Sequence, residues 1–355
     1  MRMRTDHSTV GRVRRARGRV TGVGLAALLA LTACANGASR PAYSGGSSDV
    51  GALAATGSAV SVPITTTADG SHNIVSVQIS VGGGDPVPVM LDTGSAGLLI
   101  DASVAGPQTS ATGGPFTQHY VSGPVSGSLG SAVVTIGELS TPQPITVGLV
   151  DSSSAPTAFA SGMKGILGVA TTNDGGQAML APTLQMAAPY NAGSTLQVAA
   201  TAGATGTWSL GPVTPPAGAT SIPLVAQTPG SSATPEGFPG FAQDVDLCWT
   251  IGGKAASCGP TDLDTGNDSP ALNATTYAAD GPVHTVLPSG QSIAVAPPNG
   301  APLWSFTTGQ TVGTDAVKLS SLGENTQFNT GLPFFYGRTV AWNYAGGELL
   351  LGPAA

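Results

Sequence analysis

Apolar and polar residues alternate along the stretch that begins at residue 60. Val60–Ile64 and Ile74–Val81 follow the period of two that is typical of half-buried β-strands. Four turn-forming residues, Gly82–Asp85, then lead into an apolar run at Val87–Leu91, so the pattern predicts a β-hairpin. The run ends directly in Asp92. A carboxylate at the end of a buried strand is costly unless it is hydrogen-bonded, paired or functional.

The same order of patterns recurs in the second half of the chain. Asp244–Ile251, a Gly252-Gly253 turn and Ala255–Leu263 predict another hairpin, and Asp264 follows its second strand. Both aspartates open an Asp-Thr-Gly sequence, and the two copies lie 172 residues apart. Each half also has a later apolar run that closes on glycine, Gly165–Gly168 and Leu332–Gly337. Repetition on this scale predicts two similar lobes.

The composition favours an all-β protein. The chain has 51 Gly and 28 Pro, and only 9% of its residues are charged, so strands separated by many turns are expected. A Pro- and Gly-rich stretch at 212–219 is the predicted boundary between an N-terminal lobe, residues 60–211, and a C-terminal lobe, residues 212–355.

Charge is unevenly distributed along the chain. Residues 1–33 hold seven of the 12 basic residues and one of the 19 acidic residues, so the remainder carries a formal charge of −13. A body this acidic has no electrostatic footprint for nucleic acid.

The N-terminus has the pattern of an export signal. In residues 1–33 a basic stretch precedes an apolar segment that is too short to span a membrane. The segment ends in Leu-Thr-Ala-Cys at residues 31–34, which resembles a bacterial lipobox and implies lipidation of Cys34. Residues 34–59 then read as a flexible Gly/Ser/Ala linker. We therefore expect an exported protein, lipid-anchored through Cys34 to the outer face of the cell membrane. An ordinary secretory signal with a chance cysteine is the alternative.

With two Asp-Thr-Gly copies in matching contexts, the sequence resembles the pepsin-like aspartic proteases. The element at residues 331–338 is similar to one in the divergent bacterial and mycobacterial envelope branch of that family. The resemblance covers most of residues 60–355 through short motifs. It implies a bilobal all-β fold, with two related β-barrel lobes and the active site in the cleft between them. Because one chain carries both copies, we expect a monomer.

The resemblance also implies a role for each motif residue. Asp92 and Asp264 correspond to the catalytic pair, and Thr93 and Thr265 to threonines whose hydroxyls lock the two loops together. Ser95 corresponds to the residue that hydrogen-bonds the first carboxylate. The residues expected to support the pair are Thr93, Gly94, Ser95, Thr265, Gly266 and Asn267.

A second motif is a tyrosine followed by spaced glycines: Tyr120, Gly123, Gly127 and Gly130. In the family this spacing belongs to a hairpin flap that covers the cleft. Tyr120 and Gly123 would then contact bound substrate and help to exclude water from the reacting bond. The alternative is a glycine-rich loop with a packed tyrosine.

Two carboxyl groups in one site imply a definite chemistry. They cannot both ionise cheaply, so they share one proton, and the pair can activate a water that attacks a peptide carbonyl. The sequence thus predicts an aspartic endopeptidase acting on polypeptides. No metal or organic cofactor is expected, since His72, His119 and His284 lack metal-ligand spacing.

The second loop departs from the family pattern. Asn267 stands where Ser, Thr or Gly is usual, and Asp268 adds another negative charge near the site. These two residues motivate an alternative function, a catalytically inactive lipoprotein that binds a peptide or a partner protein.

Two cysteines flank the Gly252-Gly253 turn symmetrically. Cys248 and Cys258 could therefore meet across the hairpin as a disulfide, which an exported protein permits. Two free buried thiols are the alternative.

Overall fold

The computed structural model describes residues 57–70, 72–155, 159–160, 162–171, 179–227, 238, 240–323 and 325–354. The predicted signal peptide (residues 1–33), Cys34 and the predicted linker up to residue 56 lie outside the described residues. Within the described ranges no helix has the length and apolar character needed to cross a membrane.

Strands dominate the described residues, which confirms the all-β prediction. Three short 3-10 helices interrupt them: η1 (Pro182–Gln185), η2 (Ala278–Asp280) and η3 (Leu332–Phe335). The strands are β1 (Val60–Asp69), β2 (His72–Val81), β3 (Val87–Asp92), β4 (Ala96–Asp101), β5 (Ser110–Tyr120), β6 (Gly123–Ala132), β7 (Val134–Ile136), β8 (Leu139–Ser140), β9 (Ile145–Val150), β10 (Gly165–Val169), β11 (Gly193–Gln197), β12 (Thr205–Leu210), β13 (Thr220–Pro223), β14 (Val245–Ile251), β15 (Ser257–Asp262), β16 (Ala271–Asn273), β17 (Ser292–Ala296), β18 (Trp304–Thr307), β19 (Lys318–Ser320), β20 (Phe328–Asn329), β21 (Thr339–Asn343) and β22 (Glu348–Leu351).

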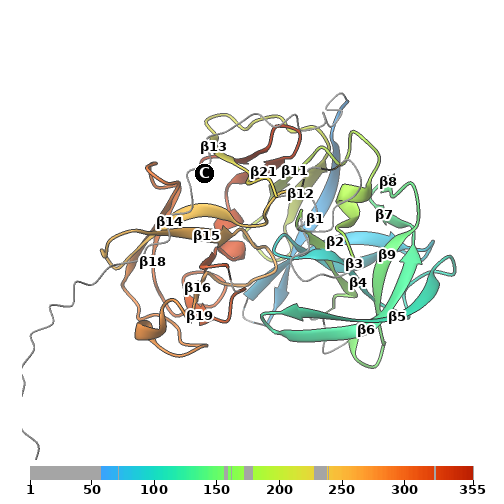
Figure 1. Ribbon diagram of the computed structural model, residues 1–355, viewed down its shortest axis with the longest axis horizontal. Coiled ribbons are helices and arrows are strands. Elements are labelled where there is room, and N and C mark those ends of the chain that lie inside the picture. Colours follow the sequence, from blue (N-terminus) through green and yellow to red (C-terminus); the bar gives the residue numbers. More distant parts are fainter. Residues whose placement is uncertain are drawn as a thin grey trace, which may run out of the picture. The chain divides into compact units, whose positions relative to one another are not determined.

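The described strands form two sheets (Figure 1). The larger sheet has 15 strands, in the order β13-β22-β21-β11-β12-β1-β2-β3-β10-β4-β9-β6-β5, with β7 and β8 attached beside β2. The smaller sheet has seven strands, in the order β18-β17-β14-β15-β20-β16-β19. Strands β13, β21 and β22 follow residue 212 but belong to the larger sheet, so the two halves of the chain share it. The lobe boundary at 211/212 stays a prediction.

The predicted first hairpin is present. Strands β2 and β3 pair antiparallel around the turn at Gly82 and Gly83, which have φ of 58° and 73°. Such positive φ values favour glycine. On its other side β3 pairs in parallel with β10, which places Gly168 opposite Asp92. Asp92 therefore ends a strand that is flanked on both sides.

The second hairpin repeats the first. Strands β14 and β15 pair antiparallel, and Gly252 and Gly253 have the same φ of 58° and 73°. Cys248 and Cys258 lie directly opposite one another in this pair and form the predicted disulfide. Strand β15 pairs in parallel with β20, as β3 does with β10. The structure thus repeats the local geometry that the sequence repeats.

One predicted match between the halves is wrong. Gly337 was expected to correspond to Gly168, but residues 332–335 form η3 and do not pair with β15. Strand β20 is the one that pairs with β15. Asn329 lies opposite Asp262 in that pair, just as Ile166 lies opposite Met90 in the pair of β10 and β3. Asp262 and Met90 each lie two residues before an Asp-Thr-Gly, so the counterpart of Gly168 is Gly331. The apolar pattern does not indicate this strand, because polar Asn329 and Thr330 replace the apolar residues that mark it in the first half.

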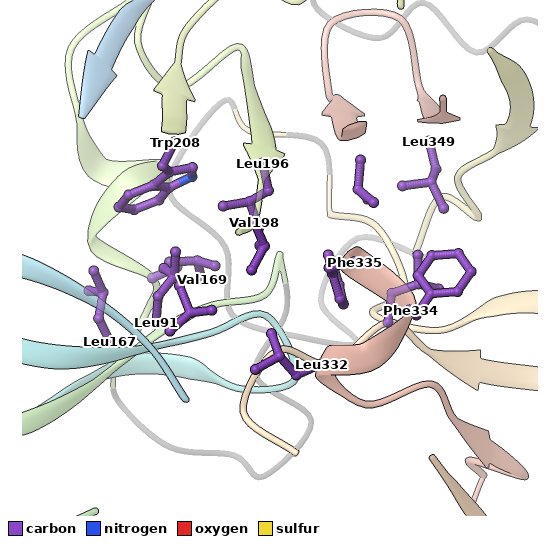
Figure 2. Packing of buried hydrophobic residues seen from close by; sticks show 14 of the residues in the cluster. Leu91, Leu167, Val169, Leu196, Val198, Trp208, Leu332, Phe334, Phe335 and Leu349 are labelled. Carbon is purple, nitrogen blue, oxygen red and sulfur yellow. The ribbon is translucent and has the colours of Figure 1, made fainter. Parts of the chain in front are cut away.

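A continuous apolar core lies behind the two Asp-Thr-Gly loops. It includes Leu91, Leu167 and Val169 from the larger sheet together with Leu332, Phe334 and Phe335 of η3. Figure 2 shows these side chains around Leu196 and Val198, which lie between the two groups. Burial of this apolar surface stabilises the packing that supports the two loops, by about 25 cal/mol of free energy for each Å² removed from water.

Candidate active site

The two Asp-Thr-Gly loops are bonded to each other through their threonines. The Thr93 hydroxyl donates to the carbonyl of Leu263 (2.6 Å), and the Thr265 hydroxyl donates to the carbonyl of Leu91 (2.7 Å). Each hydroxyl also accepts from the other threonine's main-chain N–H, at 3.0 and 3.1 Å. Both threonines are buried. Since these bonds are reciprocal, each loop fixes the position of the other.

The interlocked loops bring the two carboxyl groups together. Asp92 and Asp264 face one another across the two loops, and the two residues are 4% and 9% exposed. A Cβ atom added to Gly94 would overlap the Asp264 carboxyl, and one added to Gly266 would lie 2.5 Å from Oδ1 of Asp92. Glycine at both positions is what allows each carboxyl to rest on the opposite loop.

Asp92 is held by two donors from its own loop. The Gly94 N–H donates to Oδ1 (2.8 Å) and the Ser95 hydroxyl to Oδ2 (2.5 Å). Burial, and after it the charge of Asp264, raises the pKa of Asp92 well above its usual range, although the Ser95 and Gly94 bonds act in the opposite direction. The pair of carboxyls therefore retains a proton at pH values at which an exposed aspartate would be ionised.

Asp264 is held by one donor from its own loop and one from a distant strand. The Gly266 N–H donates to Oδ1 (2.7 Å), and the Asn329 side-chain amide donates to Oδ2 (2.7 Å). The contact expected from Asn267 is thus made by Asn329, while Nδ2 of Asn267 is buried without a partner among the described residues. Asn267 contributes its main-chain carbonyl, which accepts from the N–H of Leu332 (2.8 Å).

Asn329 is the site residue that sequence reasoning missed. It is 2% exposed, and its Oδ1 accepts from the Gly331 N–H (2.8 Å), so both ends of the amide are used. The available signal was a polar residue in the register position that Ile166 occupies in the first half. A buried asparagine in such a strand requires hydrogen-bond partners, and a nearby buried carboxyl group can supply one.

The negative charge of Asp268 is paired. Its Oδ1 lies 2.7 Å from Nζ of Lys318, and its Oδ2 lies 3.7 Å from Nδ1 of His72, whose other ring nitrogen faces Asp69 at 3.6 Å. These contacts connect the end of the β1–β2 hairpin with the second Asp-Thr-Gly loop. Asp268 is therefore not an uncompensated charge beside the carboxyl pair.

Tyr120 lies at the end of β5, directly before the turn into β6. It pairs with Gly123 in the hairpin register, and both residues of the turn, Val121 (52%) and Ser122, are exposed. The Tyr120 hydroxyl lies near Ser95 and Asp92. Burial, and after it the charge of Asp92, raises the pKa of the Tyr120 hydroxyl, so it stays neutral. The hairpin thus delivers a phenol to the residue that holds Asp92.

Comparison with known proteins agrees with this geometry. Residues 76–186 match the family model described as eukaryotic aspartyl protease. Among solved structures, the chain resembles the crystal structure of aspartic proteinase from Irpex lacteus, with 18% sequence identity and a TM-score of 0.54. The likeness covers 84% of this chain and 98% of that one. No curated protein sequence matches the chain significantly. Taken with the two interlocked Asp-Thr-Gly loops, these matches show that the chain has the bilobal all-β fold of the pepsin-like aspartic proteases.

Proposed function

We propose that the protein is an aspartic endopeptidase in which Asp92 and Asp264 together activate a water molecule. The observation that supports this best is the placement of two buried carboxyl groups face to face by the interlocked loops, each with its own fixed donors. Burying two acids side by side destabilises the fold, and neutral side chains could hold the loops at a smaller cost in free energy. A purely structural role therefore does not account for the two carboxyl groups.

The proposed reaction uses one proton shared by the pair. The ionised carboxyl accepts a proton from the attacking water, and the oxygen of that water bonds to the scissile carbonyl carbon. The protonated carboxyl donates to the carbonyl oxygen as negative charge develops there. The carboxyl that took the water proton then donates it to the leaving nitrogen of the tetrahedral intermediate, the C–N bond breaks, and one hydroxyl of the intermediate returns its proton to the pair as the carboxyl product forms, so that the pair again holds one proton.

The substrate would be an extended polypeptide bound beneath the β5–β6 hairpin. In this proposal Tyr120 and Gly123 contact the substrate, and the Tyr120 hydroxyl keeps Ser95 oriented toward Asp92. Closure of the hairpin would exclude water from the reacting bond and strengthen every hydrogen bond in the site.

We also propose that the enzyme works at the cell envelope, anchored by a lipid on Cys34. The support is the sequence of residues 1–59, in which an apolar segment, the Leu-Thr-Ala-Cys sequence and a Gly/Ser/Ala linker follow one another. The disulfide between Cys248 and Cys258 is consistent with an oxidising compartment outside the cytoplasm.

A catalytically inactive binding module is the second candidate. Asn267 and Asp268 are the two residues that favour it. Asn329 supplies the donor that Asn267 does not, and Lys318 and His72 face Asp268. Neither residue therefore gives a reason for loss of catalysis.

The experiment that tests the proposed function is cleavage of an unfolded protein between pH 3 and 7. Wild type is compared with Asp92→Asn and Asp264→Asn, and Asp246→Asn on the exposed side of β14 serves as the control. We expect cleavage by wild type and the control, inhibition by a statine-type peptide, and a fall of at least about 10³-fold in each dyad variant. Equal cleavage by all four proteins, or none by wild type at any pH, would contradict the proposal.

A further inference from the structure

A third carboxyl group lies beside the pair. Asp262 is the last residue of β15, two residues before Asp264, and its side chain is 7% exposed. The corresponding position before the first loop is Met90, so this carboxyl has no counterpart in the repeat. The proposed reaction does not use it. A buried acid that chemistry does not need must be explained in another way.

One side-chain amide connects Asp262 with the first loop. Nε2 of Gln243 donates to Oδ2 of Asp262 (2.9 Å) and also to the main-chain carbonyl of Gly94 (2.6 Å). The N–H of that same glycine donates to Oδ1 of Asp92. The contacts therefore run from Asp262 through Gln243 and Gly94 to the first catalytic carboxyl.

The other oxygen of Asp262 has no partner. Its Oδ1 is buried and makes no hydrogen bond with any residue that the structure describes. An ionised carboxylate in this position would leave a charged oxygen unsolvated, whereas a neutral carboxyl costs much less to bury. The geometry itself thus favours the protonated form.

The ionisable groups that act on Asp262 are all acidic. They are Asp264 on the same loop, Asp244 before β14 and Asp92 at the end of β3. None of the ion pairs found in the described part of the chain involves Asp262. Burial first, and then these three charges, raise the pKa of Asp262 well above its usual range, against the Gln243 bond.

We propose that Asp262 is a positioning residue for the Asp92–Asp264 pair. Asp262 fixes the first loop through Gln243, and by releasing its own proton it extends the reaction to higher pH. This inference rests on the proposed peptidase function. The pair is active while it holds one proton and loses activity when that proton leaves. An ionised Asp262 places a negative charge beside the pair and holds that proton more tightly, so wild type stays active to a higher pH than a variant that is neutral at residue 262.

The first test is the pH profile of kcat for Asp262→Asn and Asp262→Met. Asparagine retains an acceptor for Gln243, and methionine copies the residue of the first half. We expect the acid limb to stay in place and the basic limb to move to lower pH by about 0.5 units or more in both variants. The exposed Asp246→Asn should move neither limb. A basic limb that stays in place or moves upward in the two variants would overturn the proposal.

A second readout does not depend on catalysis. An acid whose pKa is higher in the folded state than in the unfolded state destabilises the fold as pH rises above the unfolded value, near 4. Wild type and Asp262→Asn should therefore have equal Tm at pH 3, and the variant should be more stable by about 2 °C or more at pH 7. Absence of this divergence would overturn the proposal even if the protein cleaves peptides. Its presence in a protein without activity would refute the peptidase function and support only the buried, protonated state of Asp262, not its role in the reaction.

The variant Gln243→Leu separates the contribution of Gln243 from that of the Asp262 carboxyl. This variant removes both hydrogen bonds but leaves the Asp262 carboxyl in place. We expect kcat to fall about tenfold with little change in KM, since Gln243 holds the loop and not the substrate. Unchanged kcat would show that the link to Gly94 does not position the pair.

Discussion

At the residue scale, the two carboxyls of the pair are held by chemically different donors. The Ser95 hydroxyl can donate to Asp92 or accept from it, whereas the Asn329 amide nitrogen can only donate to Asp264. Oδ2 of Asp264 must therefore remain an acceptor. Oδ1 of Asp264 also faces a group that can only donate, the Gly266 N–H, so both oxygens of Asp264 are held as acceptors, whereas Ser95 lets Oδ2 of Asp92 carry a proton. The two halves of the pair are thus similar in position but not in the proton arrangements open to them.

This difference predicts the effect of Asn329→Leu, which keeps the size of the side chain and removes the donor. We expect kcat to fall about 10- to 100-fold, the value of one hydrogen bond to a charged group, with KM nearly unchanged. The measurement is steady-state cleavage of an unfolded protein substrate.

The matched control is Asn267→Leu. Because Nδ2 of Asn267 makes no hydrogen bond with any described residue, this variant should keep the wild-type kcat. Similar losses in both variants would mean that the asparagine at the family position also acts on Asp264, contrary to the geometry of the site.

The sequence could predict Asp92, Asp264 and the threonines, because each lies in a contiguous motif that repeats. It could not predict Asn329 or Gln243, because their roles depend on which strands pair. Asn329 is 65 residues from Asp264, and Gln243 reaches a loop 149 residues earlier in the chain. Nothing local to either residue indicates its partner. Asp262 lies directly beside the motif, but only its burial gives it a role.

At the scale of elements, two hairpins present the two aspartates, and one of them is cross-linked. The β2–β3 hairpin is enclosed by β1, β7 and β10 in the larger sheet. The β14–β15 hairpin belongs to the smaller sheet and carries the Cys248–Cys258 disulfide. The sequence pattern predicted both hairpins, since strict alternation around a Gly-Gly turn is a strong local signal. It misplaced the partner of β15, because that strand is short and partly polar.

We predict that the disulfide contributes to stability and not to chemistry. Replacing both cysteines, Cys248→Ser with Cys258→Ser, should lower the free energy of unfolding by about 2–3 kcal/mol, as expected for a cross-link that closes a short loop. The measurement is urea unfolding of wild type and the double variant. Activity per folded molecule should be retained, and a protein of unchanged stability would show that the hydrogen bonds of the hairpin suffice.

At the scale of the whole molecule, the larger sheet joins segments that are far apart in the sequence. Strand β11 pairs with β12 on one side and with β21 on the other, and Gln197 and Thr339, 142 residues apart, share a hydrogen bond. Beyond β21 the sheet continues with β22 and β13. The bilobal fold was predictable from the repeat, but this shared sheet was not. The sequence pattern of β11 and of β21 indicates a strand in each case, but nothing in it indicates that the two strands pair with each other.

Because the sheet is shared, we predict that the first half does not form a stable folded monomer by itself. A fragment of residues 57–211 would expose one side of β11, and unpaired strand edges promote association. We expect this fragment to form oligomers or aggregates in size-exclusion chromatography, and co-expression with residues 212–355 to restore a soluble complex. A monomeric, cooperatively folding fragment would contradict this prediction.

The same sheet also governs when the molecule can fold. During synthesis the edge of β11 stays open until residues 339–343 have left the ribosome, so the first half must wait for the last strands of the chain. Contacts of such long sequence separation slow folding. The sheet of the first half is therefore expected to be completed only after the whole chain has been synthesised, which makes the last strands the final step in forming the site's support.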